Sequence, residues 1–174
     1  MTRLAVFSVK QIHTKRLLEN GQKLVRKIAS EDAIPAVDDT IEQRSPTGNE
    51  IICWPWDHSK QRLVKGNNIL NFLYHSKLSG GQDISLPTAF EIIEKTEQYV
   101  NLKTGQIKRR SAVNKNELLR ERLRVLVQLN RLKFKYVVWY TWFSSKENFD
   151  LVHYTLKRHL VGALKSNRLV ALSE

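Results

Sequence analysis

The stretch that decides the fold is residues 101–143, which have the sequence NLKTGQIKRRSAVNKNELLRERLRVLVQLNRLKFKYVVWYTWF. In residues 99–110, apolar and polar residues alternate on both sides of a Lys-Thr-Gly-Gln turn, and this pattern predicts a β-hairpin. A helix is predicted from Asn114 to Arg131, because apolar residues recur there at helical spacing. Residues 134–143 are apolar at both parities, which is typical of a strand buried on both faces. Three elements of different kinds are therefore expected within one stretch.

The remainder of the C-terminal half continues this alternation of elements. Ser144 and Glu147 have capping-box spacing, so a second helix is expected to run from there to Lys165. A last strand is predicted at residues 168–172. The resulting order of helix, strand, helix and strand favours a compact α/β unit with right-handed connections.

Two more helices are predicted before the hairpin. Residues 66–78 carry apolar residues at helical spacing and end at Ser-Gly-Gly, and residues 85–98 begin with a proline and a capping-box pattern. The predicted fold class is therefore α/β or α+β, a small mixed sheet with flanking helices. Its central buried strand would be residues 134–143, and its basic β-hairpin would be residues 99–110.

The length of 174 residues predicts one domain spanning residues 1–174. Residues 1–30 contain seven Lys/Arg and one acid, and they are expected to form a strand and a basic helix, which could stand apart as an N-terminal arm. Residues 31–49 are acidic and contain two prolines and a glycine, so they are predicted to be a loop that joins this arm to a main body of residues 50–174.

The charge of the chain points to a polyanionic partner. The net charge is +12, and eleven Lys/Arg against two acids lie between Asn101 and Lys135. We expect no membrane partner, because no basic amphipathic helix with a wide apolar face and no membrane-spanning stretch is found. The single cysteine, Cys53, fits a reducing compartment, so a cytoplasmic protein is predicted, nucleoid-associated if it binds DNA.

The function that these features favour is nucleic-acid binding in a regulatory or accessory role, with duplex DNA ahead of RNA. The hairpin has the charge layout of a wing or ribbon that touches a DNA groove, although edge charges that only keep a hairpin soluble would give the same pattern. The Arg-rich helix face could follow a phosphate backbone, or could be an ordinary solvated face. The predicted nucleic-acid-binding residues are Lys103, Lys108, Arg109, Arg110, Lys115, Arg120, Arg124, Arg131, Lys133 and Lys135.

Two tryptophans offer a different kind of contact. Trp54 and Trp56 flank a proline, and they could stack on unpaired bases, which keeps RNA open as a target. Tryptophans more commonly cover a core, so this role competes with a structural one. Cys53 lies between apolar neighbours and is expected to be a small buried side chain.

Two other functions stay open. A Mg²⁺-dependent or degenerate nuclease would fit a basic α/β domain, but Asn101 stands where PD-(D/E)xK nucleases place an acid, two positions before Lys103; Glu91, Glu94 and Glu97 are the nearest carboxylates. An interaction module could instead grip an acidic partner, or the acidic loop 31–49 could dock a basic partner, with a homodimer among the outcomes.

No cofactor or metal is expected. The five histidines lack ligand spacing, and the seven glycines do not form a phosphate-binding fingerprint.

Overall fold

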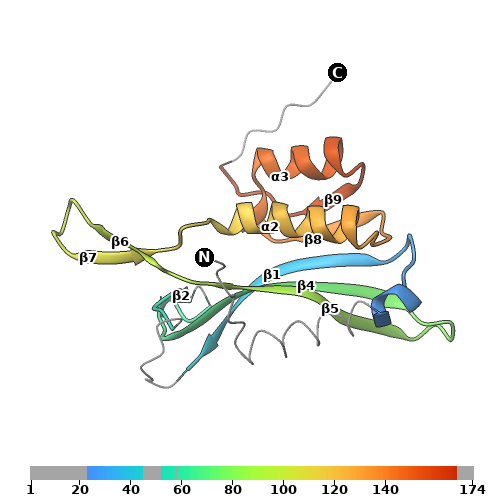
Figure 1. Ribbon diagram of the computed structural model, residues 1–174, viewed down its shortest axis with the longest axis horizontal. Coiled ribbons are helices and arrows are strands. Elements are labelled where there is room, and N and C mark those ends of the chain that lie inside the picture. The colour runs from blue at the N-terminus through green and yellow to red at the C-terminus, as the bar shows by residue number, and fades with distance from the viewer. Residues whose placement is uncertain (1–22, 45–51, 58, 168–174) are drawn as a thin grey trace, which may run out of the picture.

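The computed structural model describes residues 23–44, 52–57 and 59–167. A five-stranded mixed sheet forms one layer, and helices lie over one of its faces (Figure 1). The order of strands across the sheet is β5, β4, β1, β8 and β9. Their bounds are β1 (Ile34–Gln43), β4 (Gly66–Lys77), β5 (Asp83–Ile93), β8 (Tyr136–Trp139) and β9 (His159–Gly162).

The first three of these strands in the chain form a long antiparallel meander. β1 pairs with β4 from Ile34 opposite His75 to Gln43 opposite Gly66. β4 pairs in turn with β5, with a register shift between Phe72 and Leu73. Glycine is required at residue 66, because a Cβ atom there would lie 2.2 Å from the carbonyl oxygen of Glu42 on the neighbouring strand.

The other two strands run parallel to β1 and are reached through helices. α2 (Lys115–Arg124) continues into a π-helical turn, η1 (Val125–Leu129), before β8. A 3₁₀ turn, η2 (Thr141–Phe143), α3 (Lys146–Asp150) and a second π-helical turn, η3 (Leu151–Thr155), connect β8 to β9. β8 pairs in parallel with β1 on one side and with β9 on the other.

The core lies between the sheet and these helices. Residues at alternate positions of β4, such as Leu70, Phe72 and Tyr74, are buried, as are Leu119 and Leu123 on α2. The apolar face of the strand, formed by every second residue, therefore packs in one core with the apolar face of an amphipathic helix. The core includes Val25 from the short helical piece at residues 23–27.

Two small antiparallel ribbons extend from this body. β2 (Trp56–Asp57) pairs with β3 (Arg62–Leu63), and β6 (Glu97–Val100) pairs with β7 (Ile107–Arg110). The β6–β7 hairpin projects from one end of the molecule (Figure 1). None of the helices in the described ranges is long and apolar enough to cross a bilayer.

The mixed sheet with flanking helices, the basic hairpin and the start of the Asn114 helix are confirmed. Asn114 caps α2 with the predicted capping box: its side chain accepts from the N–H of Glu117, and the Glu117 side chain accepts from its N–H. The helical segment ends at Leu129, two residues before the predicted end at Arg131. The α-helix ends at Arg124 and the π-helical turn at Leu129, and Arg131 has a φ of 52°, which lies outside helical conformation.

The predictions for residues 31–98 are largely wrong. Residues 66–78 and 85–98 contain β4 and β5 and no helix. The sequence pattern is ambiguous here, since a run of apolar residues that satisfies helical spacing also places apolar residues on both faces of a strand. The predicted acidic loop 31–49 contains β1, the middle strand of the sheet. Acids occupy the solvent-exposed part of that strand, so the sequence does not show the regular alternation of apolar and polar residues that predicts a strand.

The predicted central strand 134–143 is shorter and lies off centre. β8 covers four of its residues and lies between β1 and β9, while Thr141–Phe143 form the 3₁₀ turn. The helix predicted from Ser144 to Lys165 is capped instead by Ser145 and is followed by β9 within the same range. The strand predicted at 168–172, and most of the arm predicted over residues 1–30, lie outside the described residues.

Candidate nucleic-acid interface

The β6–β7 hairpin is held by its turn rather than by the main sheet. The backbone N–H of Asn101 donates to Gln106 at 2.9 Å, and its side-chain oxygen accepts from the N–H of Lys103 at 2.9 Å. Gly105 has a φ of 66°, the left-handed region that glycine adopts without strain. These local contacts explain why turn chemistry alone predicts the hairpin.

All four cations of the hairpin are exposed: Lys103, Lys108, Arg109 and Arg110. Arg110 pairs with Glu97 at 3.0 Å, and its guanidinium carbon lies 5.7 Å from the centre of the Tyr99 ring. The other three cations form no ion pair with a described residue. Four cations and one acid therefore project together on a narrow ribbon.

The register divides the ribbon into two different faces. Lys108 lies opposite Tyr99, and Arg110 lies opposite Glu97, so these four side chains share one face. Arg109 lies on the other face, beside the exposed aliphatic side chains of Val100 and Ile107. Leu102 in the turn is 98% exposed. An apolar tip between cations suits a surface that is covered when a partner binds.

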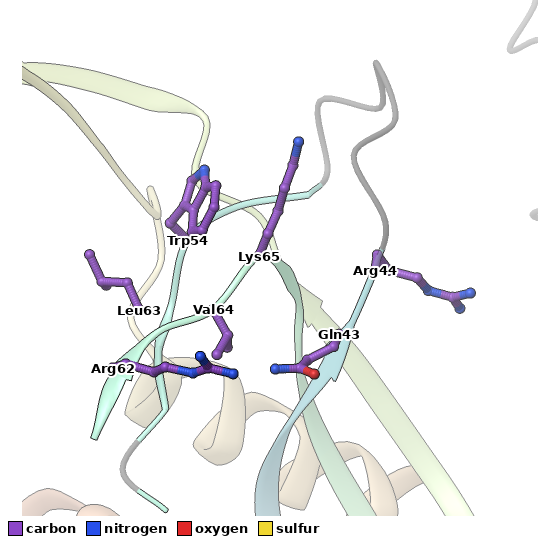
Figure 2. Close-up of a pocket in the computed structure, with 7 residues that line it drawn as sticks. All are labelled: Gln43, Arg44, Trp54, Arg62, Leu63, Val64 and Lys65. Carbon is purple, nitrogen blue, oxygen red and sulfur yellow. The ribbon is translucent and has the colours of Figure 1, made fainter. Parts of the chain in front are cut away.

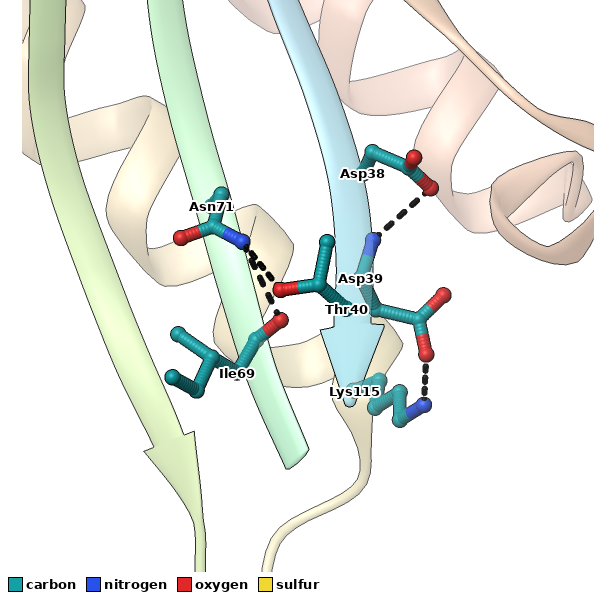
Figure 3. Close-up of polar contacts among 6 residues, drawn as sticks. All are labelled: Asp38, Asp39, Thr40, Ile69, Asn71 and Lys115. Carbon is teal, nitrogen blue, oxygen red and sulfur yellow. Dashed lines mark hydrogen bonds and ion pairs between the residues drawn. The ribbon is translucent and has the colours of Figure 1, made fainter. Parts of the chain in front are cut away.

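Lys115, at the first turn of α2, is engaged with β1. Its ammonium group pairs with the carboxylate of Asp39 (Figure 3). The same figure shows Asp38 accepting a hydrogen bond from the N–H of Asp39, at 2.8 Å. Burial raises the pKa of Asp38, and Lys115 opposes this effect only weakly. The charge of Lys115 is therefore compensated within the fold, and β1 is not a free acidic loop.

The polar side of β1 is also tied to its neighbour strand. The side-chain amide of Asn71 on β4 donates to the hydroxyl of Thr40 at 2.8 Å (Figure 3). This contact and the Lys115–Asp39 pair leave β1 anchored at the edge of the core where its side chains become exposed.

Arg120 and Arg124 line a groove of about 590 Å³ between α2 and α3. Arg120 donates to the side-chain oxygen of Asn148 at 2.8 Å, and Asn148 is fully buried. Asn148 also donates to Asn116 and to the carbonyl of Phe143, each at 2.7 Å. Arg120 therefore joins the two helices, which is a structural role.

The groove contains acids as well as cations. Lys146 pairs with Asp150 at 2.7 Å, and this hydrogen bond raises the pKa of Lys146. Glu147 also lines the groove, and a backbone hydrogen bond at the start of α3 is the main reason that its pKa is lowered. Mixed charge makes this groove a poorer match for phosphate than the hairpin.

The last three predicted residues lie at the other end of α2. Arg131, Lys133 and Lys135 belong to the connection between η1 and β8, away from the hairpin (Figure 1). The structure therefore brings Lys103, Lys108, Arg109 and Arg110 together, and it separates the remaining six along the molecule.

The carboxylates considered for a nuclease are engaged or dispersed. Glu91 on β5 pairs with Arg122 of α2, and Glu97 pairs with Arg110. Asn101 and Lys103 lie in the hairpin turn, not on a strand of the main sheet. Among the described residues, no group of three or more His, Cys, Asp or Glu side chains is placed to hold a metal ion.

Cations that the sequence pattern does not single out lie beside Trp54. Trp54 and Trp56 are 58% and 50% exposed, so neither covers the core. Arg44, Arg62 and Lys65 lie beside Trp54 in one hollow. Cys53 is buried as expected, and burial raises the pKa of its thiol. The alternation of Trp54 and Trp56 around Pro55 was visible in the sequence, but the strand that pairs with them was not.

Comparison with models of protein families, with curated proteins and with solved structures gives no match for this chain.

Proposed function

We propose that the protein binds nucleic acid, with duplex DNA as the first target, through the β6–β7 hairpin. The observation that carries this proposal is the projecting ribbon with four exposed cations and one acid. A two-stranded ribbon fits the major groove of B-DNA, which is about 12 Å wide. Cations on both faces of the ribbon could then reach the phosphates of both groove walls.

The remaining predicted cations contribute less to this interface. Lys115 and Arg120 already have partners within the fold, and Arg131, Lys133 and Lys135 lie at the far end of α2. We infer that the hairpin orients the protein on DNA, and that Arg124 and the 131–135 connection add only non-specific attraction. A regulatory or accessory protein of the cytoplasm is the role that fits such an interface.

The test is a binding titration of the whole protein with duplex DNA, single-stranded DNA and RNA of one sequence, at two salt concentrations. Tight duplex binding at physiological salt supports the proposal. Binding that vanishes for all three near ~150 mM salt would refute it, because the charge would then act only generically. Parallel samples with Mg²⁺, resolved on a denaturing gel, report strand cleavage, which would favour the nuclease instead.

A further inference from the structure

The β2–β3 ribbon continues β4 beyond the main sheet. The bridge between Cys53 and Gly66 has N–O distances of 3.1 and 3.0 Å, and the N–H of Val64 donates to Pro55 at 3.1 Å. On the other side of the same strand, the N–H of Arg44 donates to Lys65 at 3.1 Å. This register places Lys65 between Arg44 and Trp54 on three adjacent extended segments.

Strand alternation sorts the ribbon into a buried face and an exposed face. Cys53, Pro55, Asp57 and Val64 are buried. The side chains that alternate with them form an exposed face, which we call the Trp54 surface. It consists of Arg44, Trp54, Trp56 and Leu63, which are exposed, and Lys65, which is half-buried.

The backbone next to the Trp54 surface is ordered by local hydrogen bonds and by a proline. Asp57 accepts hydrogen bonds from the hydroxyl of Ser59 at 2.6 Å, from its N–H at 3.0 Å and from the N–H of Lys60 at 3.1 Å. The ring of Pro55 fixes the backbone between the two tryptophans. Little backbone conformational entropy is therefore lost when a ligand stacks on these rings.

A hollow of about 470 Å³ opens beside Trp54, and it is lined by cations. Its lining, within the part of the chain that the structure describes, includes Arg44, Arg62 and Lys65 and no acid. Figure 2 shows Trp54 and Lys65 projecting together at one end, while Arg62 and Gln43 point toward one another at the other. Arg44 points away from the hollow and pairs with Glu42 at 2.7 Å.

We infer that the Trp54 surface binds unpaired nucleotides. A base would stack on the Trp54 ring, and the adjacent phosphate would lie near Lys65, which projects on the same side. Trp56, two positions along the same strand and about 6.8 Å away, would take a neighbouring base. Exposed aromatic rings beside cations, with no acid among the described lining residues, match the chemistry of a flexible, single-stranded polyanion.

This inference takes its ligand class from the proposed function, and it adds a second site with a different preference. β2 and the β6–β7 hairpin lie toward the same end of the molecule (Figure 1). A duplex with an unpaired overhang could therefore engage both sites, with the duplex at the hairpin and the overhang at the Trp54 surface.

The test compares Trp54→Ala, Trp54→Phe and Lys65→Ala in the whole protein. Single-stranded DNA and RNA of one sequence are titrated, and tryptophan fluorescence and anisotropy are recorded. Trp54→Ala should weaken single-strand binding about 5- to 150-fold, the equivalent of one stacked base. Trp54→Phe should retain most of the affinity, and Lys65→Ala should lower the salt slope by about 0.7. If the substitutions weaken RNA binding more than DNA binding, or the reverse, the more strongly affected nucleic acid is the preferred ligand of this surface.

The matched control is Leu129→Ala, which removes another exposed apolar side chain, 73% exposed, from the end of η1, the turn that continues α2. Its single-strand affinity should equal that of the wild type. Unchanged affinity in all Trp54 and Lys65 variants would overturn the inference, as would self-association through this surface without a response to oligonucleotides. Hairpin variants test the proposed function separately. They should lose duplex binding and keep single-strand binding, because the two sites are distinct.

Discussion

The response of the two hairpin arginines to substitution should differ, because their surroundings differ. Arg109 forms no ion pair with a described residue and lies beside Val100 and Ile107. Arg110 pairs with Glu97 at 3.0 Å and lies over the Tyr99 ring. Arg109→Ala should therefore remove one phosphate contact and leave the hairpin intact, which makes it the cleaner probe of binding.

The magnitude follows from counterion release. One phosphate contact contributes about 0.9 to the slope of log K against log salt for B-DNA, and four hairpin contacts would contribute about 3.6. Arg109→Ala should lower the slope by about 0.9. Over a fourfold rise in salt, the affinity of the variant should therefore fall about 3.5-fold less than that of the wild type.

Arg110→Ala should cost more affinity than Arg109→Ala, since it also leaves the Glu97 carboxylate unpaired near DNA. The ion pair itself is exposed and worth only about 0–1 kcal/mol of stability, so the hairpin should survive its loss. Glu97→Gln should strengthen binding, because it releases Arg110 and removes a negative charge from the ribbon.

The assay is fluorescence anisotropy with a labelled duplex at four salt concentrations. Lys77→Ala is the matched control, since it removes one exposed positive charge at the end of β4. Lys77→Ala should leave the slope unchanged. An Arg109→Ala slope equal to that of the wild type, or a Lys77→Ala slope that falls equally, would refute the assignment of the interface to the hairpin.

Three further changes test the fold around the interface. Asn114→Ala removes the capping box of α2 and should lower the free energy of unfolding in urea by about 0.5–2 kcal/mol; no change would contradict the cap. Leu123→Ala should lower it by about 2–5 kcal/mol because Leu123 is fully buried, whereas Leu129→Ala should have almost no effect; equal effects would contradict the packing of α2. The hydrogen bond from Ser59 holds the pKa of Asp57 below its ordinary value. This stabilisation should be present above the ordinary carboxyl range and disappear as pH falls through the lowered pKa, so Asp57→Asn should weaken the loss of stability in acid seen by circular dichroism.

The parts of the fold that were predicted from sequence are those fixed by neighbours in the chain. The β6–β7 turn depends on Asn101 and Gly105, and the start of α2 depends on Asn114 and Glu117. Local hydrogen bonds determine both, so local patterns reveal them. β1 was missed because Asp38, Asp39 and Glu42 lie on its exposed portion, and only pairing with distant β4 and β8 makes it a strand.

The candidate site divides in the same way. The hairpin cations were predicted because they follow one another along the ribbon. The cations beside Trp54 were not, because only the pairing of residues 53–55 with residues 64–66 brings Lys65 next to it. The predicted alignment of Arg131 with Arg120 and Arg124 on one helix face is not found, because α2 passes into a π-helical turn that ends at Leu129.

The most direct test of the central claim is site-specific photocrosslinking to duplex DNA. A photoreactive amino acid would replace Leu102, 98% exposed at the hairpin tip, or Leu129, 73% exposed at the other end of α2. The account predicts a strong crosslink from residue 102 that unlabelled duplex suppresses, and little crosslinking from residue 129. Equal crosslinking at both positions, or crosslinking from residue 129 alone, would contradict binding through the hairpin.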